Sequence, residues 1–428
     1  MNKLLNSSIL LAVALAAVII LSNLTIIHDK LICDSEWYIE LAAGDYHHVG
    51  KPFINRVLYP LLAKTVVQFS GVDVKSAFLA LNIASLLILL GSLFFFIKPY
   101  ISLKALYIPV IFTPVLFDLY QNYCLPELFY AALLGIFFLL LRHEKLWGSL
   151  VLLFLLFLTR ENTIILSICT ITICFYQRRM HYAASVIVVS VAALAAISFI
   201  GHYGQPNIHR LPEILYLFLK MLINFISNFT GIIIWTNTLA LNEISAHTWR
   251  HSPLIQVALP LWLRFGEVTN IGIYGFDIFR PLNTFLGLFT SFGIGPVLLA
   301  SVVKRNYRNL MQESPVWLLI ALSYGIFSFF MGTVTGSDVT RLIAYGWPAF
   351  WIVTPILILK YYDLQFRTII KLLVINSLLC WFNIFLLCFT YNWYITTAIT
   401  ICLAIILYAF IFLRFDRLGS PASPRPVS

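Results

Sequence analysis

The chain has 428 residues, of which 61% are hydrophobic and only 11% are charged, and its formal net charge is +10. This composition excludes a soluble globular domain and predicts an all-α polytopic membrane protein. We interpret the positive charge as cytoplasmic anchors between membrane spans, and therefore expect no nucleic-acid partner.

The first apolar run, at about 9–27, is as long as a membrane span of roughly 20 residues. It lacks a small-residue cleavage site, so we expect an uncleaved helix. About twelve transmembrane helices are predicted in all. The further runs lie at about 77–97, 105–121, 126–141, 146–159, 163–176, 182–201, 282–303, 315–331, 342–359, 368–390 and 394–413.

Two runs in the outer loop at about 202–281 are ambiguous. The run at 213–236 and the Trp- and Gly-rich run near 255–276 can cross the membrane as a pair or lie in the outer interface. We favour interfacial amphipathic helices, because acidic and basic residues interrupt both runs. These residues are Glu213, Lys220, Arg264 and Glu267.

The positive-inside rule orients the chain. Short connections with basic pairs, such as Arg178 with Arg179 and Lys304 with Arg305, are expected on the cytoplasmic side, together with both termini. The prediction is one membrane domain over 1–413, with an outer active-site loop at about 28–76, followed by a cytoplasmic tail over 414–428, of which the segment Pro421–Pro426 is expected to be disordered. The expected location is the bacterial plasma (inner) membrane.

The first outer loop gathers the most polar chemistry. Asp34 and Tyr38 stand at i and i+4, so they share a helix face on which a carboxylate beside a phenol can hold and deprotonate a hydroxyl. Capping of the helix is the alternative role of Asp34. Glu36 and Glu40 share a second face of this helix, and we expect both to be solvated. Arg56 can bind an anionic phosphate or snorkel to the lipid headgroups.

The segment Asp45-Tyr46-His47-His48 contains ordinary metal ligands. Adjacent histidines on an exposed turn more often face solvent. We therefore assign no cofactor, and a divalent metal stays the secondary interpretation.

The remaining outer loops add further acids and arginines. Pro126 fits the first turn of a helix, and Glu127 after it is either a capping acid or part of a shared site. Arg160 and Glu161 interrupt an apolar stretch of about thirty residues. Because neighbours on a helix point about 100° apart, we expect them to turn toward different partners in a wet cavity. Phosphate is the predicted partner of Arg160, and pairing with Glu127 is the alternative.

The last polar outer loop contains Asp338 and Arg341 at i and i+3 near a helix start. They can form a local ion pair. If they face the cavity instead, Arg341 supplies a second cation for a phosphate, near a helix N-terminus suited to anions.

Together these motifs resemble the GT-C superfamily of polyprenyl-phosphate-sugar-dependent integral membrane glycosyltransferases. The resemblance is spread over almost the whole chain in short motifs. They are Asp34-x-x-x-Tyr38-x-x-x-Ala42-x-Gly44, Phe53-x-x-Arg56-x-Leu58-x-Pro60, Pro126-Glu127, Leu158-Thr159-Arg160-Glu161, and Asp338-x-x-Arg341 ahead of Pro348. Many relatives have two adjacent acids in the first loop, whereas this chain has Asp34-Ser35-Glu36.

The resemblance implies an inverting transfer of a sugar from a polyprenyl-phosphate donor to an acceptor hydroxyl at the extracytoplasmic face. The acceptor would be a glycan, a lipid or a protein in the assembly of a cell-envelope glycan. Asp34 would be the catalytic general base, and Arg160 or Arg341 would hold the phosphate. The other residues assigned to substrate binding are Glu36, Tyr38, Arg56, Glu127, Glu161 and Asp338.

Two other functions remain open. A polysaccharide polymerase or ligase that uses undecaprenyl-pyrophosphate-linked glycans would also need outer-face arginines, but would depend less on Asp34. A transporter would have charged or broken helices at mid-membrane in two related halves. We see no such halves in the sequence.

Overall fold

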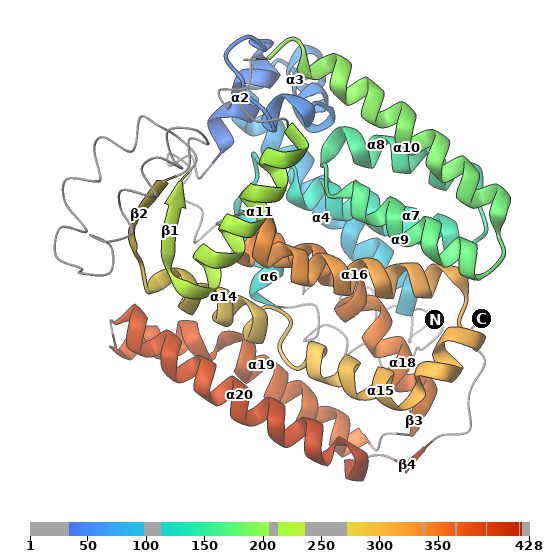
Figure 1. Cartoon of the computed structure of the whole chain (residues 1–428), viewed down its shortest axis with the longest axis vertical. Helices are drawn as coiled ribbons and strands as arrows, with labels where there is room; N and C mark the ends of the chain where they lie inside the picture. The colour runs from blue at the N-terminus through green and yellow to red at the C-terminus, as the bar shows by residue number, and fades with distance from the viewer. Residues whose placement is uncertain are drawn as a thin grey trace.

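The computed structural model is a bundle of helices of very different lengths (Figure 1). It describes residues 34–97, 113–204, 213–235, 272–336, 339–363, 366–390, 392–418 and 420–421. The prediction of an α-helical protein is confirmed for these residues, apart from two short strand pairs. The first predicted span, at about 9–27, lies outside the described residues.

The helices follow the predicted apolar runs closely at most of their ends. They are α2 (Ser35–Ala43), the 3-10 turn η1 (Phe53–Asn55), α3 (Leu58–Ser70), α4 (Val74–Ile97), α6 (Pro114–Gln121), α7 (Glu127–Arg142), α8 (Leu146–Thr159), α9 (Thr163–Tyr176), α10 (Met180–Gly201), α11 (Glu213–Thr230), α14 (Phe279–Thr290), α15 (Gly295–Glu313), α16 (Val316–Thr335), α17 (Val339–Ile343), the 3-10 turn η3 (Ala344–Gly346), the π-helix η4 (Pro348–Val353), α18 (Thr354–Tyr361), α19 (Phe366–Thr390) and α20 (Trp393–Leu418).

Fewer helices than predicted are long and apolar enough to cross a membrane. Within the described residues there are four, in α4, α10, α16 and α20, and up to six if each of two bent helix pairs counts as one span. The predicted number of twelve is therefore not reached there. One reason is that α8 and α9 have only 14 residues each. At about 1.5 Å per residue, such a helix is about 21 Å long, which is short of a hydrocarbon core of about 30 Å.

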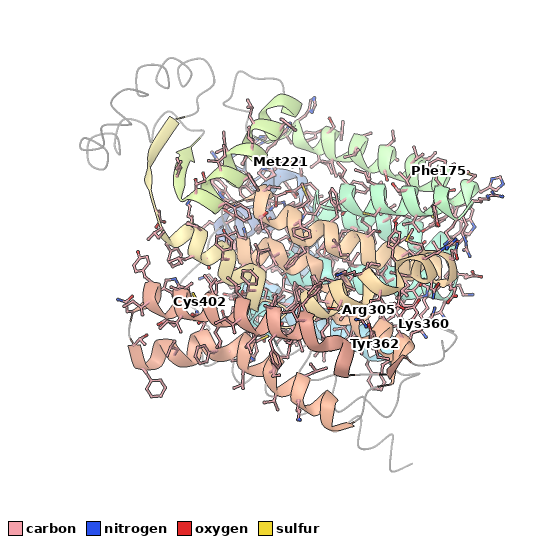
Figure 2. All side chains as sticks on the ribbon, turned by 60° about the horizontal axis from the view of Figure 1, so that its bottom comes forward. Phe175, Met221, Arg305, Lys360, Tyr362 and Cys402 are labelled. Atoms are coloured by element: carbon pink, nitrogen blue, oxygen red, sulfur yellow. The ribbon has the colours of Figure 1, made fainter. Side chains whose placement is uncertain are left out.

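The bundle has two chemically distinct ends. Helix α7 begins at Glu127 and ends at Arg142. Helix α8 then runs back along α7, and α9 returns in the direction of α7, so the end of α9 lies at the same end of the bundle as Arg142. There Arg179 lies 3.3 Å from Glu144, so the connections before α8 and before α10 lie together. Figure 2 shows Arg305, Lys360 and Tyr362 at one end as well, away from Met221 on α11. The grouping of basic connections on one face agrees with the sequence pattern.

Glycines let α16 approach its neighbours closely. A Cβ atom at Gly325 would lie 2.5 Å from the backbone nitrogen of Ala349, and one at Gly332 would lie 2.6 Å from that of Ile343. Real atoms do not approach so closely, so only glycine fits. These contacts seat α17, η3 and η4 against α16, and thereby fix the segment that bears Arg341.

The loop at about 202–281, predicted to be an outer loop with two interfacial helices, agrees with the prediction in α11 (Glu213–Thr230) and differs from it in two strands. Helix α11 is not among the candidate spans. Residues 272–276, at the end of the second predicted amphipathic helix, instead form strand β2 (Gly272–Phe276), which pairs antiparallel with β1 (Ile232–Trp235). The composition explains the difference, since isoleucines favour strands and the two glycines of β2 disfavour a helix. Residues 236–271 lie outside the described residues.

The C-terminal helix also continues beyond its predicted end. Helix α20 runs through Leu418, although its apolar part ends at Leu413 as predicted. Beyond this helix, strand β4 (Ser420–Pro421) pairs antiparallel with strand β3 (Tyr362–Asp363), which directly follows α18. The first part of the predicted tail over 414–428 is therefore a helical extension of α20, and most of the segment expected to be disordered, from 422 onward, lies outside the described residues.

Candidate functional site

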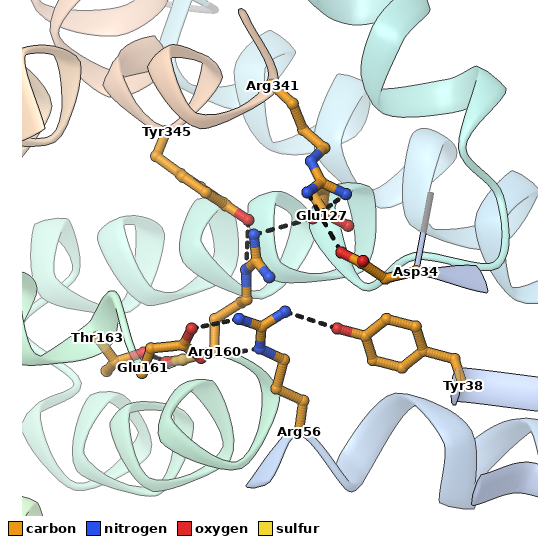
Figure 3. Close-up of polar contacts among 9 residues, drawn as sticks. All are labelled: Asp34, Tyr38, Arg56, Glu127, Arg160, Glu161, Thr163, Arg341 and Tyr345. Atoms are coloured by element: carbon orange, nitrogen blue, oxygen red, sulfur yellow. Dashed lines mark hydrogen bonds and ion pairs between the residues drawn. The ribbon is translucent and has the colours of Figure 1, made fainter. Parts of the chain in front are cut away.

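Residues from five separate segments of the chain meet at the end of the bundle where α7 begins (Figure 3). We call this group the charged cluster. Its members are Asp34, Tyr38, Arg56, Glu127, Arg160, Glu161, Thr163, Arg341 and Tyr345. Three arginines and three carboxylates lie in it, so their formal charges cancel.

Asp34 precedes the first residue of α2 and turns away from its own helix. Its side chain makes no capping hydrogen bond, so the alternative role as a helix cap is wrong. Instead, its Oδ2 atom lies 3.5 Å from Nη2 of Arg341, and 34% of the Asp34 side chain is exposed. Asp34 is thus a partly open carboxylate beside a guanidinium from a distant segment.

Arg56 follows the turn η1 and points into the cluster. Its Nε atom donates to Oε2 of Glu161 at 2.8 Å, and Nη2 donates to Oε1 of the same carboxylate. Nη1 donates to the phenol oxygen of Tyr38 at 2.8 Å. The ring of Phe53 lies 5.5 Å from the guanidinium carbon. Because Arg56 is buried by these partners, snorkelling toward headgroups is not its role.

The protonation states of Glu161 and Tyr38 follow from these contacts. Glu161 lies in the break between α8 and α9, and 47% of its side chain is accessible. Partial dehydration opposes its ionisation, but the charge and hydrogen bonds of Arg56 outweigh this effect and lower the pKa of Glu161 to about 2. Burial raises the pKa of the Tyr38 phenol above its ordinary value, so Tyr38 is neutral.

Arg160 is held from two sides in the interior. Its backbone is extended and ends α8. Nη2 lies 2.9 Å from Oε1 of Glu127, and Nε donates to the phenol oxygen of Tyr345 at 2.6 Å. The hydroxyl of Thr163 donates to the Arg160 carbonyl at 2.7 Å and closes the break. The prediction that Arg160 and Glu161 turn toward different partners is confirmed, and the pair with Glu127 is formed.

Arg341 lies between two carboxylates. Its Nη1 atom is 3.6 Å from Oε1 of Glu127, which is also the partner of Arg160, and Nη2 faces Asp34. The Arg341 side chain is 11% exposed and that of Glu127 only 1%. Asp338 lies outside the described residues, so its predicted local pair with Arg341 is not described.

Most of the predicted site residues meet in the cluster. Seven of the nine do so, namely Asp34, Tyr38, Arg56, Glu127, Arg160, Glu161 and Arg341. Glu36 is exposed and has no part in the contacts above, because it stands two residues after Asp34 and points elsewhere on the helix.

Sequence analysis missed Thr163 and Tyr345. The spacing of each residue in the sequence contains a signal. Tyr345 stands four residues after Arg341, the spacing that puts two side chains on one helix face. Thr163 stands three residues after Arg160, and at this spacing a threonine hydroxyl can donate to the backbone carbonyl of the earlier residue.

Metal ligands do not converge in the part of the chain that the structure describes. His48 lies 3.8 Å from Asp45, and both side chains are largely exposed. Among the described residues, no group of three or more His, Cys, Asp or Glu side chains is placed to hold a metal ion.

An apolar depression of about 200 Å³ is lined by residues from the segment 41–61 and from α10. It lies between α2, α3 and the end of α10. Its lining residues are Leu41, Tyr46, Val57, Pro60, Leu61 and Ile200. Val57 directly follows Arg56 in the chain, so the lining of the depression begins one residue from a member of the cluster.

Comparisons with protein-family models, with curated proteins and with solved structures found no match. The chemistry of the site is therefore read from its geometry. A partly open carboxylate can accept a proton from a hydroxyl, and an adjacent guanidinium can hold a phosphate.

Proposed function

We propose that the chain is a membrane glycosyltransferase, with Asp34 as general base. It would move a sugar from a polyprenyl-phosphate donor to an acceptor hydroxyl at the extracytoplasmic face of the bacterial inner membrane, with both termini in the cytoplasm. The observation that carries the proposal is the contact of 3.5 Å between the carboxylate of Asp34 and the guanidinium of Arg341. The proposal agrees with the resemblance of the motifs to the GT-C superfamily.

Asp34 suits the activation of the acceptor hydroxyl, and Arg341 suits the departure of the lipid phosphate. Asp34 takes the proton of the acceptor hydroxyl while the hydroxyl oxygen forms a bond to the anomeric carbon of the sugar. The bond from that carbon to the phosphate oxygen breaks, and the lipid phosphate leaves with the electron pair. A positioned base contributes about 10² to 10⁴ in rate. Arg341 stabilises the charge that develops on the leaving phosphate.

The apolar depression supports a lipid-linked donor. An isoprenoid unit next to the phosphate would lie against Val57 and Leu61, and the phosphate would face the cationic cluster. A water-soluble nucleotide sugar would gain nothing from such a surface. This arrangement favours a donor with an apolar chain directly attached to an anion.

We assign Arg160 a positioning role instead of direct phosphate binding. Its side chain is only 3% exposed and is engaged by Glu127 and Tyr345. Arg341 is the more accessible cation at 11%. Arg160 would therefore hold Glu127, which in turn faces Arg341, while Arg341 meets the donor.

A transporter is the second candidate, because two helix pairs are broken. The axes of α14 and α15 differ by 59°, and the helical segment that begins with α17 bends by 44° at Pro348. Broken helices at mid-membrane are common in transporters. Arg341 and Tyr345 of the second pair belong to the charged cluster, but the cluster lies at the end of the bundle where α7 begins, which favours the enzyme.

The test is a transfer assay in membranes that contain the protein, with a series of radiolabelled polyprenyl-phosphate sugars. We expect the wild type to consume one of them, and Asp34→Asn to lose transfer by about 10² or more at an unchanged protein level. Asp45→Asn is the matched control, since Asp45 is an exposed acid of the same loop outside the cluster. Wild-type transfer by D34N would exclude Asp34 as the base and favour the polymerase or ligase alternative.

A further inference from the structure

We propose that the donor phosphate displaces Asp34 from Arg341, so that the carboxylate becomes available to the acceptor hydroxyl only after the donor has bound. This inference rests on the proposed function and adds the order of events at the same site. Arg341 would exchange one anionic partner for another. The acceptor would then meet a competent base only in the presence of the donor.

The lengths of the ion pairs favour this exchange. Arg341 lies 3.5 Å from Asp34 and 3.6 Å from Glu127, whereas Arg160 lies 2.9 Å from Glu127. Longer ion pairs that water can reach are weak. A phosphate oxygen that bonds directly to the guanidinium at about 2.8 Å is a stronger partner for Arg341 than the Asp34 carboxylate at 3.5 Å.

Accessibility decides which carboxylate leaves. The Glu127 side chain is 1% exposed and cannot turn toward water without unfolding its surroundings. Glu161 is more accessible, but Arg56 holds it by two hydrogen bonds. Asp34 is 34% exposed, faces Arg341 at long range, and stands at the start of α2 without a capping bond. Asp34 is therefore the acid that can withdraw at the lowest cost.

The charge balance of the cluster points to the same event. Three arginines match three carboxylates in the cluster. An entering phosphate adds negative charge to a poorly hydrated region, which is unfavourable unless an acid moves toward solvent. Withdrawal of Asp34 leaves the phosphate beside Arg341 and restores the local balance.

The exchange has a catalytic consequence. Oδ2 of Asp34 faces the guanidinium of Arg341 and is therefore engaged by a cation. After displacement, both carboxylate oxygens can accept the hydroxyl proton. An acceptor that arrives first finds the base engaged, so acceptor activation waits for the donor.

The test measures the binding of polyprenyl phosphate, the lipid product without its sugar, to the purified full chain in detergent. Asp34→Asn removes the competitor for Arg341, so we expect it to tighten binding about threefold to tenfold although it abolishes transfer. Asp45→Asn should leave the affinity unchanged. In an Arg341→Ala background, we expect D34N to change the affinity by less than about twofold.

Each other result has a definite meaning. Unchanged or weaker binding by D34N, with clear binding by the wild type, overturns the exchange but leaves the proposed function standing. Equal tightening with and without Arg341 shows simple charge repulsion and also overturns it. No binding by the wild type overturns the proposed function itself. If R341A does not fold, Arg341→Gln replaces it, with the elution profile as the measure of folding.

Discussion

Arg56 and Glu161 form a doubly hydrogen-bonded ion pair that ties the loop before α3 to the break between α8 and α9. Nε of Arg56 donates to Oε2 of Glu161 at 2.8 Å, and Nη2 donates to Oε1. The two residues are 105 positions apart in the sequence. Because Arg56 is buried, this pair both neutralises an interior cation and fixes the relative position of the two segments.

We expect Glu161→Gln to lower the melting temperature in detergent by about 2 °C near pH 7, which corresponds to about 1 kcal/mol. The folded-state pKa of Glu161 is about 2, below the ordinary value of 4.5. Its ionised carboxylate therefore stabilises the fold fully above pH 4.5, and this contribution is lost as the pH falls through about 2. Scanning fluorimetry should show the difference from the wild type shrinking between pH 4.5 and 3.

Glu144→Gln provides the control for this experiment. Glu144 pairs with Arg179 at 3.3 Å, but its side chain is 72% exposed. Exposed pairs contribute little, so we expect a change within about 1 °C. A Glu161→Gln difference that is as large at pH 3 as at pH 7 would contradict the assignment of an ionised, paired Glu161.

Tyr345→Phe tests whether Arg160 depends on its phenol partner. Tyr345 is buried, and its oxygen accepts a hydrogen bond of 2.6 Å from Arg160. Removal of that oxygen leaves a buried N–H of a cation without its partner, at a cost of about 1 to 3 kcal/mol. The unfolding temperature of the purified protein should fall by several degrees. Tyr176→Phe, at an exposed position at the end of α9, should change it by less than about 1 °C.

Much of this site follows from the sequence, because charged residues in an apolar chain are few and costly. Arg160 and Glu161 interrupt an otherwise apolar stretch, and the structure ends α8 at Thr159 and begins α9 at Thr163. Their divergence follows from helix geometry alone. The partners of Arg160 and Glu161 do not follow from helix geometry, because Glu127 and Arg56 reach them through tertiary packing.

Other features depend on contacts that no local pattern encodes. The pairing of β1 with β2 joins segments on either side of residues 236–271, and hydropathy predicted helices for both. The number of spans is a second case, but its signal is local: the runs at 146–159 and 163–176 already have the bounds of α8 and α9, and 14 residues are fewer than the roughly 20 of a full span. Tyr345 is a third, because an aromatic residue in an apolar run is ordinarily part of the core.

Gly332→Ala should damage the fold through the segment that bears Arg341. A Cβ atom at Gly332 would lie 2.6 Å from the backbone nitrogen of Ile343, which cannot move without shifting α17. We expect a loss of about 1 to 3 kcal/mol or a failure to obtain monodisperse protein. Gly91→Ala is the matched control, because a Cβ atom there meets nothing within 4 Å. Because alanine has a higher helix propensity than glycine, the stability of Gly91→Ala should equal that of the wild type or be slightly higher. Equal elution profiles and melting curves for both variants would contradict the close packing at Gly332.

Arg341→Lys separates a need for charge from a need for guanidinium geometry. Lysine keeps the positive charge but cannot form two parallel hydrogen bonds to a phosphate. If Arg341 holds the departing lipid phosphate, kcat/KM for the polyprenyl-phosphate donor should fall by about 10², because removal of one preorganised donor group typically has an effect of this size. Arg179→Lys, at an exposed arginine 3.3 Å from Glu144, should leave kcat/KM unchanged. The measurement is the initial rate of transfer over a range of donor concentrations, with protein amounts matched by elution profile. A wild-type kcat/KM for R341K would show that positive charge alone suffices at this position, and would contradict the proposed need for guanidinium geometry.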